Sequence, residues 1–302
     1  MNFEVLEHPG LPGHALLDSG GGEKLERFGD WTLRRPDPQS LWQPRKGPQD
    51  WDAASLRFER ESDRGGHWVA GPGERPPESW ELPLDLPGLP RGCRVRIQPT
   101  PFKHVGLFPE QAANWLWVEQ RRAALESAGA AAPRLLNLFA YTGVASIFAA
   151  KAGWQVTRVD ASKTSLDWAA ANARLSGLPD QAVRWLLEDA AKFAARELRR
   201  GNTYHGVLLD PPAYGRGPKG EKWHFGADIA PLLETCRQLL EPSTPSFLLL
   251  SAYAIDYSPL AFHNLLAGWG GQTQVAQLAL PEAASPRLLP CGFVARWCQA
   301  HP

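Results

Sequence analysis

The chain has 302 residues and carries 32 basic and 32 acidic side chains, so its formal net charge is zero. That balance gives no support to a strongly basic nucleic-acid-binding domain, although it allows a local basic patch. The four cysteines form no C-x-x-C pair, which argues against a zinc or redox motif and predicts no bound metal. We see no signal peptide and no apolar run long enough to span a bilayer, so we expect a cytoplasmic protein without membrane contact.

Residues 1–100 are rich in proline, glycine and tryptophan and predict a small β-rich domain. Alternating segments at Ser55–Arg60 and Arg94–Gln98 are typical of half-buried strands. Proline and glycine cluster between them, as in Gly71–Pro77, and indicate turns. The tryptophans of this region could stack on nucleic-acid bases, but the core of a small β domain accounts for them better.

Residues 101–302 predict a second domain in which strands alternate with helices. We expect seven strands, at residues 134–139, 155–159, 183–187, 204–209, 246–251, 272–280 and 292–299. Helices are expected between them, including residues 145–152, 162–175 and 258–266. This alternation is typical of βαβ units and predicts an α/β fold with a mostly parallel, seven-stranded sheet. Ligands of such sheets bind beyond the carboxyl ends of the strands, so we expect the functional residues to lie there.

The first strand of this domain ends in a turn that runs from Asn137 to Gly143. Gly143 would let the backbone approach a ligand closely, although an ordinary strand-to-helix turn is the simpler alternative. A G-x-G-x-x-G fingerprint is absent, which argues against a dinucleotide diphosphate. The second strand ends at Asp160, whose carboxylate could accept hydrogen bonds from ribose hydroxyls or instead cap the helix that begins near Ser162.

The third and fourth strands also end in acidic residues. Asp189 could accept from an adenine amino group, or it could cap the following helix. The fourth strand runs into Asp210, Pro211, Pro212 and, two residues on, Tyr214. Two prolines stiffen this loop and remove two backbone donors, which suits the presentation of an amino group or a flat base. The alternative is a rigid loop without function. We favour a functional loop, because the other three strands also end in candidate ligand-binding residues.

A basic, glycine-rich segment, Gly215–Trp223, follows that loop. Arg216, Lys219 and Lys222 could contact a phosphate backbone while Trp223 stacks on a base, or the segment could be a solvated loop. His104 is a weaker candidate, since it could orient a substrate or act as a base but could equally be a hydrogen-bonded structural residue.

The strand ends resemble those of class I, Rossmann-like S-adenosylmethionine-dependent methyltransferases over about residues 95–300. The likeness is greatest to ribosomal-RNA large-subunit enzymes that modify cytosine C5 or guanine N7, which have an N-x-F-x-Y-T-G loop and a D-P-P loop. The resemblance implies S-adenosylmethionine as the cofactor and RNA as the substrate, with Asp210, Pro211, Pro212 and Tyr214 facing the acceptor as catalytic residues. The cofactor-binding residues that it implies are Phe108, Glu110, Gln111, Asn137, Phe139, Tyr141, Thr142, Gly143, Asp160, Ala161, Ser162, Asn172, Asp189, Ala190 and Asp210.

Two features depart from these RNA methyltransferases. The resemblance implies an N-terminal RNA-binding module of the PUA type, and residues 1–90 show no convincing one. Methylation of cytosine C5 also needs a cysteine nucleophile. Neither Leu250–Ala254, where the cytosine enzyme carries it, nor the Asp210–Ala213 loop contains a cysteine. We therefore expect transfer to nitrogen or oxygen, which requires only an acceptor held in line with the sulfonium.

Two other functions stay open at this point. A methyltransferase for a small molecule or a protein would explain the zero net charge and the missing RNA module. A binding protein that keeps the cofactor pocket without chemistry is the second alternative, although the intact Asp210–Pro212 loop argues against it.

Overall fold

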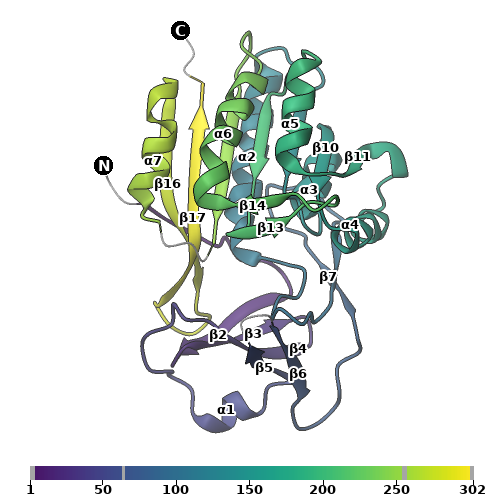
Figure 1. Cartoon of the computed structure of the whole chain (residues 1–302). Helices are drawn as coiled ribbons and strands as arrows, with labels where there is room; N and C mark the ends of the chain where they lie inside the picture. Colours follow the sequence, from purple (N-terminus) through teal and green to yellow (C-terminus); the bar gives the residue numbers. More distant parts are fainter. Residues whose placement is uncertain (1–3, 63–64, 254–256, 300–302) are drawn as a thin grey trace.

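The computed structural model describes residues 4–62, 65–253 and 257–299, and it forms two lobes stacked along one axis (Figure 1). The upper lobe is a sheet covered by helices on both faces. The lower lobe is a small sheet of five strands with one short helix, α1 (Pro48–Asp52), at its foot. The predicted combination of an α/β fold with a β-rich N-terminal part is therefore confirmed.

The large sheet has eight strands in the order β1-β16-β17-β15-β12-β9-β10-β11. Their bounds are β1 (Glu4–Glu7), β9 (Arg134–Leu138), β10 (Gln155–Asp160), β11 (Val183–Leu187), β12 (Gly206–Leu209), β15 (Phe247–Ala252), β16 (Gln272–Pro281) and β17 (Leu288–Cys298). All neighbouring pairs are parallel except those that β17 makes with β15 and β16. The carboxyl ends of β9, β10, β11 and β12 consequently lie along one edge of the sheet.

The eighth strand, β1, was not predicted, so the expected count of seven is one short. β1 pairs in parallel with β16 at the edge of the large sheet, although the sequence division at residue 100 assigned it to the N-terminal domain. The strand is only four residues long and largely exposed. Neither alternation nor a buried apolar run therefore marks it in the sequence.

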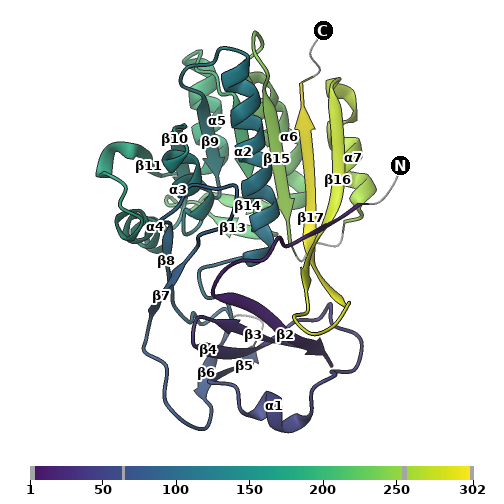
Figure 2. The same ribbon diagram turned by 180° about the vertical axis from the view of Figure 1, so that it is seen from behind.

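Helices cover both faces of the large sheet. α2 (Ala112–Ser127), α3 (Val144–Lys151) and α4 (Lys163–Leu175) lie on the face seen in Figure 2, and α5 (Ala190–Arg199), α6 (Phe225–Leu239) and α7 (Pro259–Leu266) lie on the other. The sequence did not predict α2, because tryptophans, alanines and charged residues alternate along it without a clear apolar stripe. No helix in the described ranges combines the length and the apolar character that a membrane crossing needs.

The lower lobe contains β2 (His14–Gly20), β3 (Glu23–Phe28), β4 (Trp31–Pro36), β5 (Leu56–Ser62) and β6 (Gly65–Ala70). The tryptophans of this region hold the lobe together, as their core alternative predicted. Trp51 is buried and donates to Asp18 Oδ2 at 3.1 Å, and Trp68 donates to the carbonyl of Thr100 at 2.8 Å.

Several contacts fasten the two lobes to each other. The tip of the β16–β17 hairpin reaches β2, where Ser19 Oγ donates to Glu282 Oε1 at 2.5 Å (Figure 1). A second hairpin, β7 (Trp80–Pro83) with β8 (Arg94–Ile97), runs up to α4. There the Arg94 N–H donates to Ser176 Oγ at 3.0 Å and the Arg96 N–H donates to Asn172 Oδ1 at 2.8 Å. Residues on the N-terminal side of residue 100 thus support the large domain directly.

A buried group of charges lies within the small sheet. The Glu26 side chain is fully buried and accepts from Arg35 Nε at 3.0 Å, and His14 Nε2 lies 3.2 Å from its other oxygen. Lys24 Nζ lies 3.5 Å from Glu26 Oε2. Arg35 and Lys24, together with the hydrogen bond to His14, hold the pKa of Glu26 well below its ordinary value in spite of its burial.

Glu26→Gln is expected to reduce the free energy of unfolding by about 3–5 kcal/mol, because it leaves the Arg35 guanidinium buried without its counterion. Urea unfolding followed by circular dichroism measures this loss. Glu81→Gln is the control: it breaks an ion pair with Arg94 whose two side chains are 47% and 48% exposed, and a loss of about 1 kcal/mol or less is expected. Equal losses in the two variants would contradict the prediction.

Candidate cofactor and acceptor site

A cavity opens where β9, β12 and β15 end, beside α2. Its mixture of apolar walls with a few polar groups is typical of small-molecule sites. The sequence-predicted residues that line it are Phe108, Gln111, Asn137, Phe139, Tyr141, Thr142 and Asp210. The structure therefore places the segment before α2, the turn after β9 and the residue after β12 around one cavity.

The turn that follows β9 has an unusual backbone. Phe139 and Tyr141 have φ values of 56° and 46°, in the left-handed region that side chains other than glycine rarely adopt. One hydrogen bond from the end of β10 restrains this turn, and a second holds the Asp160 side chain that accepts it. Asp160 Oδ2 accepts from the Tyr141 N–H at 2.7 Å, and Asp160 Oδ1 accepts from the Ser162 N–H at 2.9 Å. Backbone strain that neighbouring elements maintain is characteristic of functional sites.

Gly143 has a packing role that the sequence did not predict. It precedes α3 with a φ of 77°, and a Cβ atom there would lie 2.9 Å from the Cβ of Ala169 on α4. The glycine is needed for this turn and for the close packing of α3 against α4. Close approach of its backbone to a ligand stays a prediction.

Asn172 supports the same turn from behind and does not line the cavity. Its side chain is fully buried, with Nδ2 donating to the carbonyl of Thr142 at 3.0 Å. Thr142 Oγ1 in turn donates to the carbonyl of Gly106 at 2.7 Å. A Cβ atom at Gly106 would lie 2.1 Å from the Trp168 ring, so only glycine lets this segment pass between α4 and the cavity.

Of the two predicted acids, Asp189 caps a helix, as its alternative allowed, whereas Asp160 ends β10 and leaves the cap of α4 to Ser162. Ser162 caps α4 and accepts from the Ser165 N–H at 3.2 Å, next to Asp160 and Ala161. Asp189 caps α5 and accepts from the Lys192 N–H at 2.9 Å, directly before the buried Ala190. A carboxylate offers about four acceptor positions, so Asp160 and Asp189 each keep capacity for a ligand.

A chain of amides occupies the α2 end of the cavity. Gln111 Nε2 donates to Ser251 Oγ at 3.0 Å and to Tyr253 Oη at 2.7 Å. Asn114 Nδ2 donates to Gln111 Oε1 at 2.7 Å, and Arg296 Nη2 donates to Asn114 Oδ1 at 2.7 Å. Asn114 and Ser251 also line the cavity, and the sequence analysis missed both. Ser251 ends a strand and Asn114 lies three residues after Gln111, so the strand-end rule and helix spacing could have found them.

Two carboxyl groups lie close to each other beyond the end of β12. Asp210 directly follows that strand and is partly exposed, and desolvation together with the nearby Glu110 raises its pKa to about 7. Glu110 is 5% exposed, and burial raises the pKa of its own carboxyl group as well. Burial, together with these two carboxyl groups, raises the pKa of Tyr253 well above its ordinary value. Asp210 is therefore the cavity-lining group whose charge changes near neutral pH.

The loop that follows Asp210 is pinned by the next segment, which is a hairpin, β13 (Tyr214–Arg216) with β14 (Lys222–His224). Trp223 Nε1 donates to the carbonyl of Pro212 at 2.7 Å, and the Trp223 ring lies 4.9 Å from that of Phe139. Trp223 is 6% exposed, so the expectation that it stacks on a base is wrong. Pro211 is buried and Tyr214 is 72% exposed, with its ring 4.7 Å from that of His224.

His104 and the cysteines do not supply reactive groups. The His104 ring lies 5.2 Å from that of Phe108, and burial together with Arg35 and Lys103 lowers its pKa to about 3. An imidazole with that pKa is a poor base at neutral pH. The stretch Leu250–Ala254, where the cytosine enzyme carries its cysteine, has none here, and its last residue, Ala254, lies outside the described residues. Across the described ranges, no group of three or more His, Cys, Asp or Glu side chains is arranged to hold a metal ion.

The lining chemistry fits S-adenosylmethionine. A carboxylate and aromatic faces, from Asp210, Phe108 and Tyr141, suit a cationic sulfonium. The amides of Gln111 and Asn114 suit an amino acid end. No Lys or Arg from the described part of the chain lines the cavity, so a polyphosphate would find no matching charge there.

Comparisons with known proteins agree with this chemistry. Two curated relatives are named ribosomal RNA large subunit methyltransferase K/L. The one from Hahella chejuensis is 34% identical over 155 residues, or 50% of this chain and 20% of the relative. The one from Syntrophotalea carbinolica is 42% identical over 123 residues, or 40% of this chain and 16% of the relative. The chain thus spans about a fifth or less of the length of these relatives.

Two solved structures match almost the whole chain. A SAM-dependent methyltransferase from Agrobacterium tumefaciens is 38% identical, with a TM-score of 0.88 and coverage of 98% of this chain and 96% of that one. The putative methyltransferase SMU.776, solved with SAH, shares the fold at 19% identity, with a TM-score of 0.71 and coverage of 97% and 77%. The sequence model of the S-adenosylmethionine-dependent methyltransferase family matches residues 13–255. The chain therefore belongs to the S-adenosylmethionine-dependent methyltransferases, and its cofactor is S-adenosylmethionine.

Proposed function

We propose that this enzyme methylates RNA, with ribosomal RNA as the leading candidate, at a nitrogen or oxygen atom. The observation that carries the proposal is the basic hairpin attached directly to the Asp210–Tyr214 loop. Arg216, Lys219 and Lys222 of this hairpin are exposed and form no ion pair within the described ranges. A phosphate backbone close to the acceptor loop would match these free cations.

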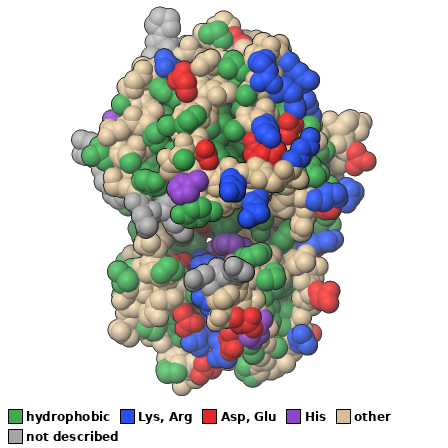
Figure 3. Space-filling view, viewed as in Figure 1, with side chains coloured by type: hydrophobic (Ala, Val, Ile, Leu, Met, Phe, Trp, Pro, Cys, Tyr) green, Lys and Arg blue, Asp and Glu red, His purple; other side chains and the backbone are tan. Residues whose placement is uncertain are grey.

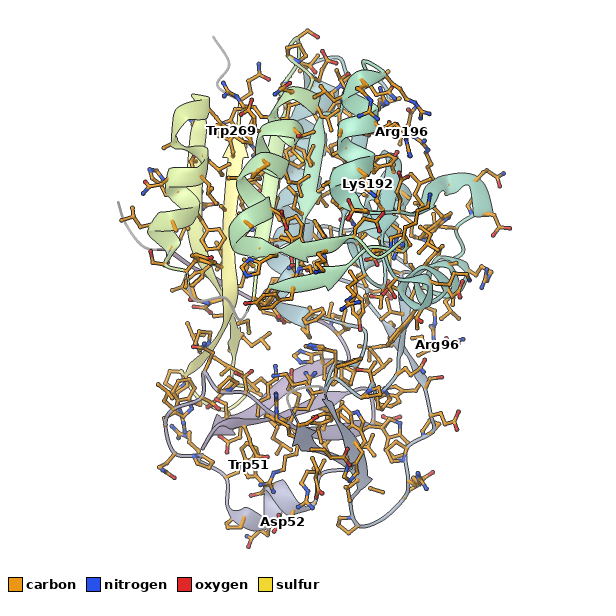
Figure 4. All side chains as sticks on the ribbon, viewed as in Figure 1. Trp51, Asp52, Arg96, Lys192, Arg196 and Trp269 are labelled. Carbon is orange, nitrogen blue, oxygen red and sulfur yellow. The ribbon has the colours of Figure 1, made fainter. Side chains whose placement is uncertain are left out.

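The hairpin is part of a wider basic face. Figure 3 shows Lys and Arg side chains gathered over α5 and the β13–β14 hairpin, with some acidic side chains among them. Lys192 and Arg196 extend from α5 on this side (Figure 4). Lys192 Nζ lies 2.6 Å from Glu221 Oε1, which ties α5 to the hairpin. Phosphate contacts along such a face would orient a nucleic acid without reading its sequence.

The names of the curated relatives add a second line of support for RNA. Both are called ribosomal RNA large subunit methyltransferase K/L, and the alignment covers half of this chain or less. That likeness favours an RNA substrate and leaves the nucleotide open.

We assign the parts of the cofactor to the strand ends. Asp160 would accept from the ribose hydroxyls, and Asp189 would accept from the adenine edge. The Asn137–Gly143 turn, with Phe108, Glu110 and Gln111, would surround the methionine part. Asp210 would lie beside the sulfonium, where a negative charge stabilises the bound cation.

The chain's own groups can supply what methyl transfer requires. The bound cofactor supplies an electrophilic methyl group on a cationic sulfur. Pro211 and Pro212 hold the acceptor loop stiff, and the Trp223 indole fixes one of its carbonyls, so an acceptor atom can be held in line. Asp210, with a pKa of about 7, is suited to take up the proton that a nitrogen or oxygen acceptor loses. No cysteine is needed for such a transfer.

Methylation of a small molecule or a protein is the alternative function. The zero net charge of the chain favours it, because a dedicated RNA-binding protein usually carries a basic surplus.

We expect the purified enzyme to transfer tritiated methyl groups to total RNA from cells that lack the protein, and not to their protein or small-molecule fractions. Asp210→Ala should abolish the transfer while calorimetry still detects cofactor binding. Label in the protein or small-molecule fraction alone would replace the RNA proposal with its alternative.

Charge reversal in the hairpin, Lys219→Glu with Lys222→Glu, is expected to weaken RNA binding by about tenfold at low salt and to leave cofactor affinity unchanged, because each lysine would lose a phosphate contact. Filter binding at several salt concentrations measures the effect and should give a shallower salt dependence. Lys46→Glu, in the exposed segment before α1, is the control. A loss no larger than the control's would contradict this role.

The affinity for S-adenosylmethionine is expected to fall by several-fold as the pH is lowered from 8 to 6. Protonation of Asp210, whose pKa is about 7, removes the negative charge that attracts the sulfonium. Calorimetric titration measures the effect, with two controls that should show little pH dependence: the Asp210→Asn variant, and S-adenosylhomocysteine, which lacks the sulfonium charge. A similar decline for S-adenosylhomocysteine would point to another group.

A further inference from the structure

Arg158 is a charged residue inside the large sheet, on β10 two residues before Asp160. Its side chain has no exposed surface, and its neighbours in the sheet are Asn137 on β9 and Trp185 on β11. A guanidinium is rarely buried to this degree without a counterion in direct contact. The residue has no part in the site as described above.

The contacts of Arg158 all point to the cofactor turn. Its Nη2 donates to the carbonyl of Tyr141 and lies 3.8 Å from Asp160 Oδ2. Nε and Nη1 are buried and have no hydrogen-bond partner. Asp160 Oδ2 is also the atom that accepts from the Tyr141 N–H. Arg158 and Asp160 therefore hold the same left-handed residue by its carbonyl and its N–H.

Burial of this guanidinium lowers the stability of the fold. A buried cation with two unpartnered donors carries a large desolvation penalty, and burial lowers the pKa of Arg158 accordingly. An apolar side chain of similar length would avoid that penalty at this position. The compensating benefit must come from the turn and from Asp160, which are the groups that Arg158 touches.

We propose that Arg158 is a positioning residue for the cofactor. It fixes the Tyr141 peptide in the strained conformation and keeps Asp160 ionised, so that a carboxylate faces the ribose position at neutral pH. This extends the proposed role of Asp160, because Arg158 would act on the cofactor only through Asp160 and the turn.

The charge of Asp160 depends on few neighbours. Burial raises the pKa of its carboxyl group, and Arg158 is the largest influence that lowers it, followed by the N–H groups of Ser162 and Tyr141. The Tyr141 phenol has a pKa of about 12, so it stays neutral. The charged side chains on the adjoining elements are already paired, Glu188 with Arg196 and Lys163 with Asp167. Without Arg158, the Asp160 carboxyl group should protonate at a higher pH.

The test compares the wild type with Arg158→Met by calorimetric titration with S-adenosylhomocysteine between pH 7.5 and 5.5. This ligand avoids the response of Asp210 to the sulfonium. We expect Arg158→Met to bind it about tenfold more weakly at pH 7.5, with a further decline toward pH 5.5 that the wild type lacks. Arg34→Met, which removes an arginine that pairs with Glu23 and Asp52 in the lower lobe, is the control and should lower the melting temperature without changing affinity.

Arg158→Lys keeps the charge but loses the planar guanidinium, so we expect an affinity loss of about threefold and a flat pH profile. If Arg158→Met does not fold, Arg158→Lys decides, and wild-type affinity in that variant overturns the proposal. Wild-type affinity and pH profile in a folded Arg158→Met variant would overturn it equally. Asp160→Asn separates this proposal from the assignment of Asp160: if it binds S-adenosylhomocysteine normally, Asp160 is not a cofactor ligand.

Discussion

The hydrogen bond from the Tyr141 N–H to Asp160 is the contact on which the cofactor site depends. It joins the ends of two neighbouring strands, so the turn after β9 takes its shape from β10 and not from its own residues. Thr142 is anchored in the same way, through its hydroxyl to Gly106 and through its carbonyl to Asn172. A turn restrained from several sides can hold two left-handed residues before any ligand arrives, which is the preorganisation that tight binding needs.

The lower lobe contributes to this site through the chain that leaves it. After β8 the backbone passes Trp168 on α4 at Gly106, and then brings Phe108 and Gln111 to the cavity. Since β8 is hydrogen-bonded to Asn172 on α4 and to Ser176 directly after it, the path of this segment is fixed relative to the large sheet. Arg35 on β4 also holds this segment, because its Nη1 donates to the carbonyl of Lys103 at 3.1 Å.

The sequence predicted the parts of the fold that follow from periodicity and strand ends. The alternation of strands and helices, the Asp160 and Asp210 positions and the cavity-lining turn all came from such patterns. The edge strand β1 and the helix α2 could not, because one is too short and the other has no apolar stripe. Sequence patterns could not predict roles that depend on contacts between distant residues. Gly143 packs against Ala169, Trp223 donates a hydrogen bond to the carbonyl of Pro212, and the guanidinium of Arg158 is buried.

The indole of Trp223 occupies part of the hydrogen-bonding capacity of the loop after Asp210. One carbonyl of the double-proline loop accepts the indole N–H, so a single lone pair of that oxygen is left for an incoming amino group. Under the proposed function, the exposed Tyr214 ring and the cations of the hairpin would supply further substrate contacts away from the reacting atom. Changes in the hairpin could then alter the substrate while the proposed acceptor loop keeps its conformation.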